Sequence, residues 1–231
     1  MKYLIVNGDD FGASRGINRG IIEAHRRGIL TSTSLIVNAP WSQEAALLSR
    51  AAPDLSVGLH VHLINEAREQ AAGPVDGDSY HAELYRQFSR FQELMNRLPT
   101  HLDSHHNIHR DPRLLPHFLD LARKSGLPLR EHSPVCYFSK FYGQWGGESH
   151  LEQISVESLI RILETEVQAG VTELSCHPGY VDPDFPSGYS VERETELQTL
   201  CNPLIRRVLA EQLIQLVSFG TLGNLLAGLP A

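Results

Sequence analysis

The sequence has few cysteines and no cluster of positive charge. Its 231 residues include three cysteines, Cys136, Cys176 and Cys201, without CxxC spacing. An odd number of cysteines argues against a disulfide framework, and the lack of CxxC spacing argues against a cysteine-rich zinc site. We therefore expect reduced thiols. The chain carries 27 acids and 20 bases, a formal charge of −7, and no run of Lys or Arg. This balance disfavours nucleic acids and anionic membranes as partners.

Membrane and secretion signals are also missing from the sequence. No apolar run approaches the length that would cross a bilayer, so we expect no membrane insertion. The N-terminus enters a predicted strand directly and lacks the charged, apolar and small-residue segments of a signal peptide. The sequence therefore predicts a cytoplasmic protein.

Strand and helix patterns alternate along the chain. We expect strands at residues 3–6, which run into Asp9 and Asp10, and then at 32–38, 56–63, 100–105, 127–131, 172–176 and 215–219. Helical spacing covers residues 17–25, 42–50, 80–97, 112–124, 156–168 and 191–212, the last broken near Pro203. Ser14 is the expected N-cap of the first helix and Gly28 its stop. Residues 65–78 are expected to be loop, and residues 133–153 a long ordered loop over a site.

Seven strand and helix units without an internal repeat predict a parallel sheet in an α/β protein. In a single domain of residues 1–231 they favour a distorted, seven-stranded (β/α) barrel that is TIM-barrel-like. A doubly wound open sheet is the alternative. Such a sheet usually has a Gly-rich phosphate turn after its first strand, whereas here that turn contains Asp9 and Asp10 and would repel a phosphate.

Acids and histidines occur where several predicted strands end. They are Asp9 and Asp10 after the first strand, His60 and His62 on the third, His101, His105, His106 and His109 at the fourth, and His177 after the sixth. A parallel barrel brings these ends to one face. Two adjacent carboxylates repel each other unless a positive charge lies nearby, and a divalent cation is the simplest source. Mixed carboxylate and imidazole ligands suit zinc, manganese or a related metal.

Four segments in order resemble the signature segments of the YdjC-like carbohydrate deacetylases, a family that includes the chitooligosaccharide deacetylases. The segments are NGDDFG (7–12), GLHVHL (58–63), THLDSHHNIH (100–109) and SCHPGY (175–180), followed by SGY at 187 and ERETEL at 192. The resemblance implies a metal-dependent hydrolase that removes acetyl from an N-acetylated mono- or oligosaccharide by cleaving a linear amide C–N bond. It also implies one divalent ion, Mg²⁺ or Zn²⁺, and leaves a homodimer open.

Carried over residue by residue, the family's metal ligands fall on Asp10, His60 and His105. Asp9 matches the acid that works on the water, and His177 matches a His near the end of the barrel. The chemistry agrees, because a metal ion lowers the pKa of a water molecule that it binds and polarises the acetyl carbonyl. Asp9 can then accept the water proton, and His177, with a pKa near the operating pH, can protonate the departing amine.

Further residues have less certain assignments. Arg130 is expected to orient Asp9 or stabilise its charge, with a surface Arg in a turn as the alternative. Asp103 is expected to fix an imidazole tautomer, or else to be a structural acid. His109 would share a face with His105 if that run were helical, which makes it the rival third ligand.

Other residues near the predicted site are expected to pack or to bind outside the metal. If both segments are extended, His62 and His106 are expected to point away from His60 and His105, and Cys176 is expected to be a core residue. Asn107 stands where family members often have His, which would change an outer contact and with it the substrate preference. The aromatic side chains expected either to stack on sugar rings or to pack locally are Trp41, Phe141, Tyr142 and Trp145.

Two rival functions remain from the sequence. The first is another barrel metallohydrolase, such as an amidohydrolase or phosphoesterase, but these typically carry an HxH pair on the first strand and here the pair is on the third. The second is a metal- or sugar-binding protein that kept the fold and lost turnover. The presence of Asp9, Asp10 and His177 speaks against that loss.

Overall fold

The computed structural model describes residues 1–63, 77–183, 185 and 187–227. Its strands are β1 (Lys2–Phe11), β2 (Ser32–Leu35), β3 (Ser56–Val61), β4 (Leu102–Ser104), β5 (Val135–Phe138), β6 (Gln144–Trp145), β7 (Glu148–Ser149), β8 (Gly170–Cys176) and β9 (Ile214–Leu216). Its helices are α1 (Arg15–Arg27), α2 (Ser42–Arg50), α4 (Gly77–Met95), α5 (Leu115–Ser125), α6 (Val156–Thr165), α7 (Val191–Leu200), α8 (Pro203–Glu211) and α9 (Phe219–Ala227), with 3-10 helices η1 (His105–Arg110) and η2 (Leu151–Ile154).

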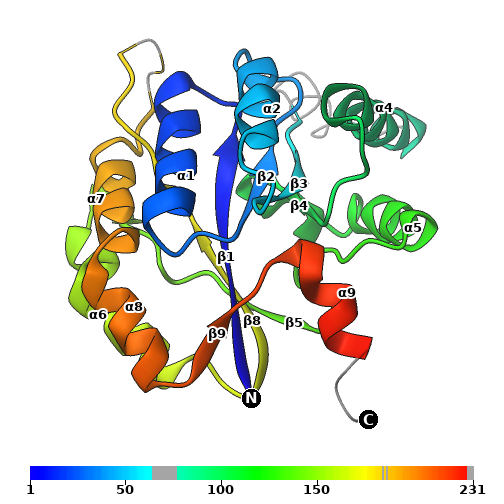
Figure 1. The fold of residues 1–231 in the computed structure, drawn as a ribbon. Helices are drawn as coiled ribbons and strands as arrows, with labels where there is room; N and C mark the ends of the chain where they lie inside the picture. Colours follow the sequence, from blue (N-terminus) through cyan, green and yellow to red (C-terminus); the bar gives the residue numbers. More distant parts are fainter. Residues whose placement is uncertain (64–76, 184, 186, 228–231) are drawn as a thin grey trace.

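The main sheet is parallel throughout, with the strand order β4-β3-β2-β1-β8-β5. β9 pairs with residues 2–4 of β1, and β2 pairs with residues 7–11 further along. Figure 1 shows β1 at the centre of this curled sheet with helices around it. The predicted parallel sheet is therefore confirmed. Among the strands described, however, no pairing joins β4 to β5, so the predicted barrel is seen only as a curled sheet.

The predicted strand at residues 127–131 is wrong in extent. Only Leu129 forms a bridge to β4, at Leu102, and the next residue, Arg130, donates its backbone N–H to the Leu102 carbonyl at 3.0 Å. Glu131 then has a φ of 64°, which ends the extended geometry. The strand that completes the sheet is β5, which lies in the segment predicted as loop and pairs with β8.

Local signals in the sequence predict several helix boundaries correctly. Ser14 caps α1 by accepting a hydrogen bond from the Ile17 backbone N–H at 3.1 Å, and Gly28 follows its last residue. The predicted break near Pro203 separates α7 from α8. Most of the loop predicted at residues 65–78 lies outside the described residues. None of the helices within the described ranges combines the length and apolar character that crossing a bilayer requires.

Alternate residues of β1 face different layers, and this positions the site. Tyr3 and Ile5 pack with Phe219 of α9 in a small apolar cluster, whereas their neighbours on β1 join the larger core. Further along the Tyr3 face are Asn7 and Asp9, both buried. This face of the strand therefore carries apolar side chains at its start and polar side chains at its carboxyl end. Parallel α/β proteins bind ligands at that end.

Candidate active site

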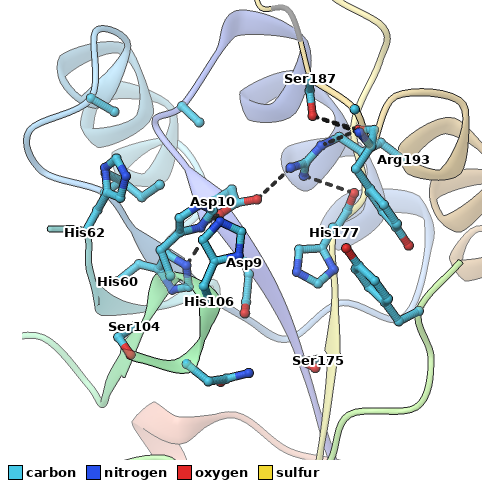
Figure 2. A pocket seen from close by; sticks show the side chains of 18 of the residues that line it. Asp9, Asp10, His60, His62, Ser104, His106, Ser175, His177, Ser187 and Arg193 are labelled. Atoms are coloured by element: carbon cyan, nitrogen blue, oxygen red, sulfur yellow. Dashed lines mark hydrogen bonds and ion pairs between the residues drawn. The ribbon is translucent and has the colours of Figure 1, made fainter. Parts of the chain in front are cut away.

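A β-bulge at the end of β1 brings two adjacent carboxylates to one cavity. Between Gly8 and Phe11, β1 contains one more residue than the paired stretch of β2. Asp10 has a φ of 70°, a left-handed conformation that is uncommon outside glycine. In a regular strand Asp9 and Asp10 would face opposite sides. Here both line the same cavity of about 860 Å³ (Figure 2).

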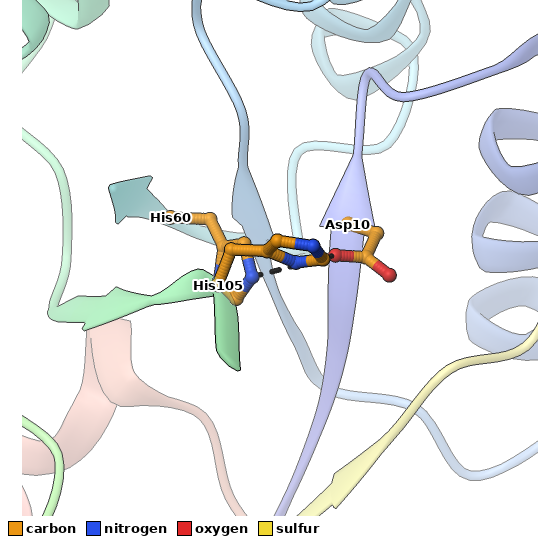
Figure 3. A group of neighbouring side chains, drawn as sticks. All are labelled: Asp10, His60 and His105. Atoms are coloured by element: carbon orange, nitrogen blue, oxygen red, sulfur yellow. Dashed lines mark hydrogen bonds and ion pairs between the residues drawn. The ribbon is translucent and has the colours of Figure 1, made fainter. Parts of the chain in front are cut away.

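Asp10, His60 and His105 meet at this cavity (Figure 3). Asp10 Oδ1 lies 3.4 Å from His60 Nε2 and 3.0 Å from His105 Nδ1. One ligand atom from each side chain lies within 4.8 Å of the others, which is a spacing that a single metal ion can bridge. The structure therefore brings together the three side chains that the family resemblance assigns to a metal, which we call the triad.

The charges around the triad suit a divalent cation. His60 Nδ1 pairs with Asp103 Oδ1 at 2.7 Å, so its Nε2 faces Asp10, a carboxylate–histidine arrangement common behind metal ligands. Burial opposes a charge on His60, yet the carboxylates of Asp103 and Asp10 raise the pKa of its imidazole to about 10. The site attracts positive charge strongly, and its carboxylate and imidazole donors fit a divalent ion.

Arg193 contacts the other oxygen of Asp10, and sequence analysis assigned it no role. Its Nη2 donates to Asp10 Oδ2 at 2.6 Å, while its Nε donates to the Tyr189 carbonyl at 3.1 Å and its Nη1 to the His177 carbonyl at 3.4 Å. Burial disfavours the charge on Asp10, but Arg193, His105 and His60 together outweigh it, and the pKa lies well below its usual range. The sequence feature that could have pointed to Arg193 is the ERETEL segment, which contains it and resembles a family segment.

Asp9 is paired with Arg130 in the protein interior. Arg130 Nη1 and Nη2 donate to the two Asp9 oxygens, each at 2.8 Å, and Asn7 Nδ2 donates to Oδ1 at 2.8 Å. Arg130 is only 2% exposed, which excludes the alternative of a surface Arg in a turn. Burial raises the pKa of Asp9, but the guanidinium outweighs burial and the pKa is lowered. Asp9 is therefore an ionised, oriented carboxylate.

Arg130 also binds two further buried acids, and we call this group the inner charge cluster. Arg130 Nη2 lies 2.9 Å from Asp103 Oδ2 and 2.7 Å from Glu173 Oε1. Burial raises the pKa of Glu173 to about 7 although Arg130 opposes this. Asp9, His60 and Asp103 also have metal-ligand spacing, but here the guanidinium of Arg130 supplies the cation.

His177 follows β8 and lies across the cavity from His60 and His62 (Figure 2). Its backbone N–H donates to Glu196, a buried acid that the sequence analysis also left without a role. Its ring lies 5.5 Å from the ring of Tyr142 and 5.6 Å from that of Tyr189. Burial lowers the pKa of His177 to about 4, although Asp9 and Asp10 oppose this. Burial therefore places the pKa of His177 below the near-neutral value that the sequence led us to expect.

Comparison with known proteins identifies the family. The chain matches the model of YdjC-like proteins over residues 3–211. It belongs to that family. Chitooligosaccharide deacetylases of Serratia marcescens and Yersinia pestis are 36% and 34% identical to it, each over 94% of this chain and 98% of its own length.

Solved structures agree with the fold of this YdjC-like chain. A candidate cellobiose-phosphate cleavage protein of Enterococcus faecalis is 29% identical with a TM-score of 0.81, over 96% of this chain and 98% of its own. A family 4 carbohydrate esterase of Streptomyces lividans, solved with acetate, has a TM-score of 0.58 at 15% identity, over 93% of this chain and 91% of its own. This second likeness concerns the fold alone.

Three further histidines of the YdjC-like protein lie near the triad, and two of them are oriented differently from what was expected. His109 is buried, with its Nδ1 2.6 Å from Ser104 Oγ, and it lies outside the triad, so the rival ligand set is not formed. The ring of His62 lies 4.9 Å from that of His105 and lines the cavity, because positions two apart on a strand share a face. His106 also lines it, because the segment after β4 is η1 and not extended. The prediction that His62 and His106 point away is wrong.

The remaining predicted residues near the site either are buried in the core or line the cavity, with Trp41 in neither group. Cys176 is fully buried, and burial raises the pKa of its thiol, as expected for a core residue. Phe141 is also fully buried, so it packs locally and cannot meet a sugar. Tyr142 and Trp145 line the cavity of this YdjC-like protein, whereas Trp41 is not among its lining residues.

Proposed function

We propose that this protein is a metal-dependent deacetylase that removes the acetyl group from an N-acetylated sugar of the chitooligosaccharide type. The observation that carries the proposal is the triad of Asp10, His60 and His105, on a cavity that also contains Asp9 and His177. The two relatives named as chitooligosaccharide deacetylases support the reaction and the substrate class.

The triad would bind one divalent ion, Mg²⁺ or Zn²⁺. When bound, that ion supplies a Lewis acid for activating water and polarising the acetyl carbonyl. Residues behind the ligands fix their orientation: Asp103 contacts His60 Nδ1 at 2.7 Å, and Arg193 contacts Asp10 Oδ2 at 2.6 Å. Because Arg193 takes one oxygen of Asp10, the other is directed toward the two imidazoles.

Asp9 and His177 are the proposed proton-transfer residues. Asp9 is ionised by its contact with Arg130 and lines the cavity, so it can accept the proton of the attacking water. His177 is neutral at rest because burial lowers its pKa, so it takes up a proton from solvent before it delivers that proton to the departing amine. Its backbone contact with Glu196 fixes the end of β8 from which the ring projects.

A phosphoesterase is the rival enzyme, and the charges of the cavity disfavour it. Arg110 and Arg193 line the cavity, but each is paired with a carboxylate, Arg110 with Glu131 at 2.7 Å and Arg193 with Asp10 at 2.6 Å. A phosphate group would have to compete with these pairs, because Arg binds both anions by the same geometry. A neutral acetamido sugar meets no such competition.

Acetate release from diacetylchitobiose, measured together with metal content, tests the proposal. We expect turnover by the wild type with about one metal ion per chain, and loss of both metal and turnover in Asp10→Ala. Metal binding without acetate release would indicate a silent binding protein of this fold. Release of phosphate from a phosphorylated disaccharide, without acetate release, would favour the phosphoesterase.

A further inference from the structure

A series of aromatic rings leads from His177 to the rim of the cavity. The ring of Tyr142 stacks on that of Tyr189, with centroids 4.6 Å apart and planes 6° apart, and meets the His177 ring at 5.5 Å. The ring of Trp145 meets that of Tyr142 at 6.4 Å and 87°. Tyr189 is 7% exposed and Trp145 is 53% exposed, so the rings become more accessible with distance from His177. We call Tyr142 and Trp145 the aromatic wall.

Trp145 is presented on an anchored hairpin. β6 pairs with β7 so that Trp145 lies opposite Glu148, across Gly146 and Gly147. These two glycines have φ values of 60° and 86°, as a tight two-residue hairpin turn requires. Gln144, beside Trp145, donates to Glu192 of α7 at 3.0 Å. An exposed Trp on a tied hairpin loses little conformational freedom when a ligand binds, which favours a recognition role.

Two asparagines that line the same cavity have side-chain oxygens without a hydrogen-bond partner among the described residues. The side-chain oxygens of Asn38 and Asn107 are buried and accept no hydrogen bond from the described residues. Asn38 Nδ2 donates to the carbonyl of His62, a residue on the side of the cavity away from His177 (Figure 2). A pyranose ring has apolar C–H faces and a rim of hydroxyl groups, so it matches aromatic rings combined with polar side chains.

We propose that the aromatic wall binds the sugar ring next to the one that is deacetylated. This subsite rests on the proposed function and deepens it, because it assigns to Tyr142 and Trp145 the discrimination between a substrate of one sugar ring and a substrate of two. The cavity, at about 860 Å³, lies toward the upper end of the usual range of about 300–1,000 Å³ for small-molecule pockets, which leaves room beyond one ring. Contacts to that remote ring raise kcat/KM at the reacting ring.

The two tryptophans of the chain provide a matched pair of variants. Trp41 lies outside the cavity lining, with the Arg15 guanidinium 4.0 Å above its ring. Acetate release is measured with N-acetylglucosamine, diacetylchitobiose and triacetylchitotriose. Trp145→Ala should lower the ratio of kcat/KM for the disaccharide to that for the monosaccharide by about tenfold. Trp145→Phe should recover part of the ratio, and Trp41→Ala should leave it unchanged.

A binding measurement separates this subsite from the chemistry. In Trp41→Phe the only tryptophan is Trp145, so its fluorescence reports on the aromatic wall. Diacetylchitobiose should change the emission at concentrations where N-acetylglucosamine does not. An unchanged kcat/KM ratio in Trp145→Ala, or an equal response to both sugars, would overturn the subsite. If the wild type releases no acetate, the proposed deacetylation fails, while the fluorescence response still decides whether the subsite exists.

Discussion

The triad and the inner charge cluster both hold buried carboxylates next to His60, but they obtain positive charge differently. In the inner charge cluster one guanidinium, that of Arg130, lies within 2.9 Å of Asp9, Asp103 and Glu173. In the triad, Asp10 Oδ1 faces two imidazoles at 3.0 and 3.4 Å on the wall of a cavity. Although His60 contacts both groups, only the triad is placed to receive a cation from outside the protein.

This difference shows that metal-ligand spacing alone does not identify a metal site. A buried Arg saturates carboxylates with hydrogen bonds in fixed directions and leaves no space for an ion. Asp9 and Asp10 are adjacent in sequence, yet the bulge of β1 gives one to Arg130 and the other to the triad. The contrast predicts opposite results when each group is disrupted.

The largest expected effect comes from the imidazoles of the triad. His60→Ala and His105→Ala should each lower metal affinity by more than about 100-fold, because a catalytic site needs three protein ligands and leaves a further position open. Metal titration measures this directly, with His109→Ala as the matched control. Full metal occupancy in the His105 variant, combined with loss in the His109 variant, would contradict the assignment.

Removal of Arg130 should affect stability strongly. Arg130→Ala leaves three buried acids without their cation and should lower the free energy of unfolding by about 3–5 kcal/mol, as urea denaturation would show. Arg110→Ala is the control, because Arg110 is half exposed in its pair with Glu131 and such pairs contribute about 0–1 kcal/mol. If added metal restored the stability of the Arg130 variant, the inner charge cluster would be a second metal site and the comparison would fail.

Asp9 and His177 should respond differently to the leaving group. Asp9→Asn and His177→Ala should each slow deacetylation by roughly 10²–10⁴ while metal stays bound, since each removes a proton-transfer partner. An activated acetyl ester or anilide departs with little help, so it should largely rescue His177→Ala and not Asp9→Asn. Equal losses on both substrates would refute this division of roles, and rescue of the Asp9 variant alone would reverse it.

The smallest expected effect is a pH dependence from Glu173. Burial raises its pKa from an ordinary 4.5 to about 7, so the folded state keeps a proton that the unfolded state has released. The stabilisation is complete below about pH 4.5 and is lost as the pH rises through about 7. Urea denaturation between about pH 5 and 8 should show the wild type losing stability relative to Glu173→Gln. Parallel curves would mean that Arg130 keeps Glu173 ionised throughout.

Periodicity, capping and motif order predicted much of the architecture. The predicted limits of α2 coincide with those observed, the Ser14 cap is formed, and Pro203 opens α8. The parallel direction of the strands could also be predicted, because strand and helix patterns alternate. These features depend on residues close together in the chain, so local composition contains the information.

Contacts between segments far apart in the chain could not be predicted from these local patterns. The choice of β5 as a strand in place of residues 127–131 depends on its pairing with β8, which is remote in sequence. Arg193 and Glu196 reach the site because α7 packs beside α1 and η2, which lets Arg193 contact Asp10 and Glu196 accept the backbone N–H of His177. Neither the helix pattern nor the residue types revealed those contacts.

The sequence by itself determined which chemical groups this protein places at the ends of its strands. Acids and histidines after predicted strands, together with the order of the family's segments, indicated a metal site with a base and an acid beside it. Only the tertiary structure decided which carboxylate faces which cation, because the bulge at Asp10 and the burial of Arg130 depend on contacts between distant strands. Those contacts, and the desolvation that they impose, set the charge of each group.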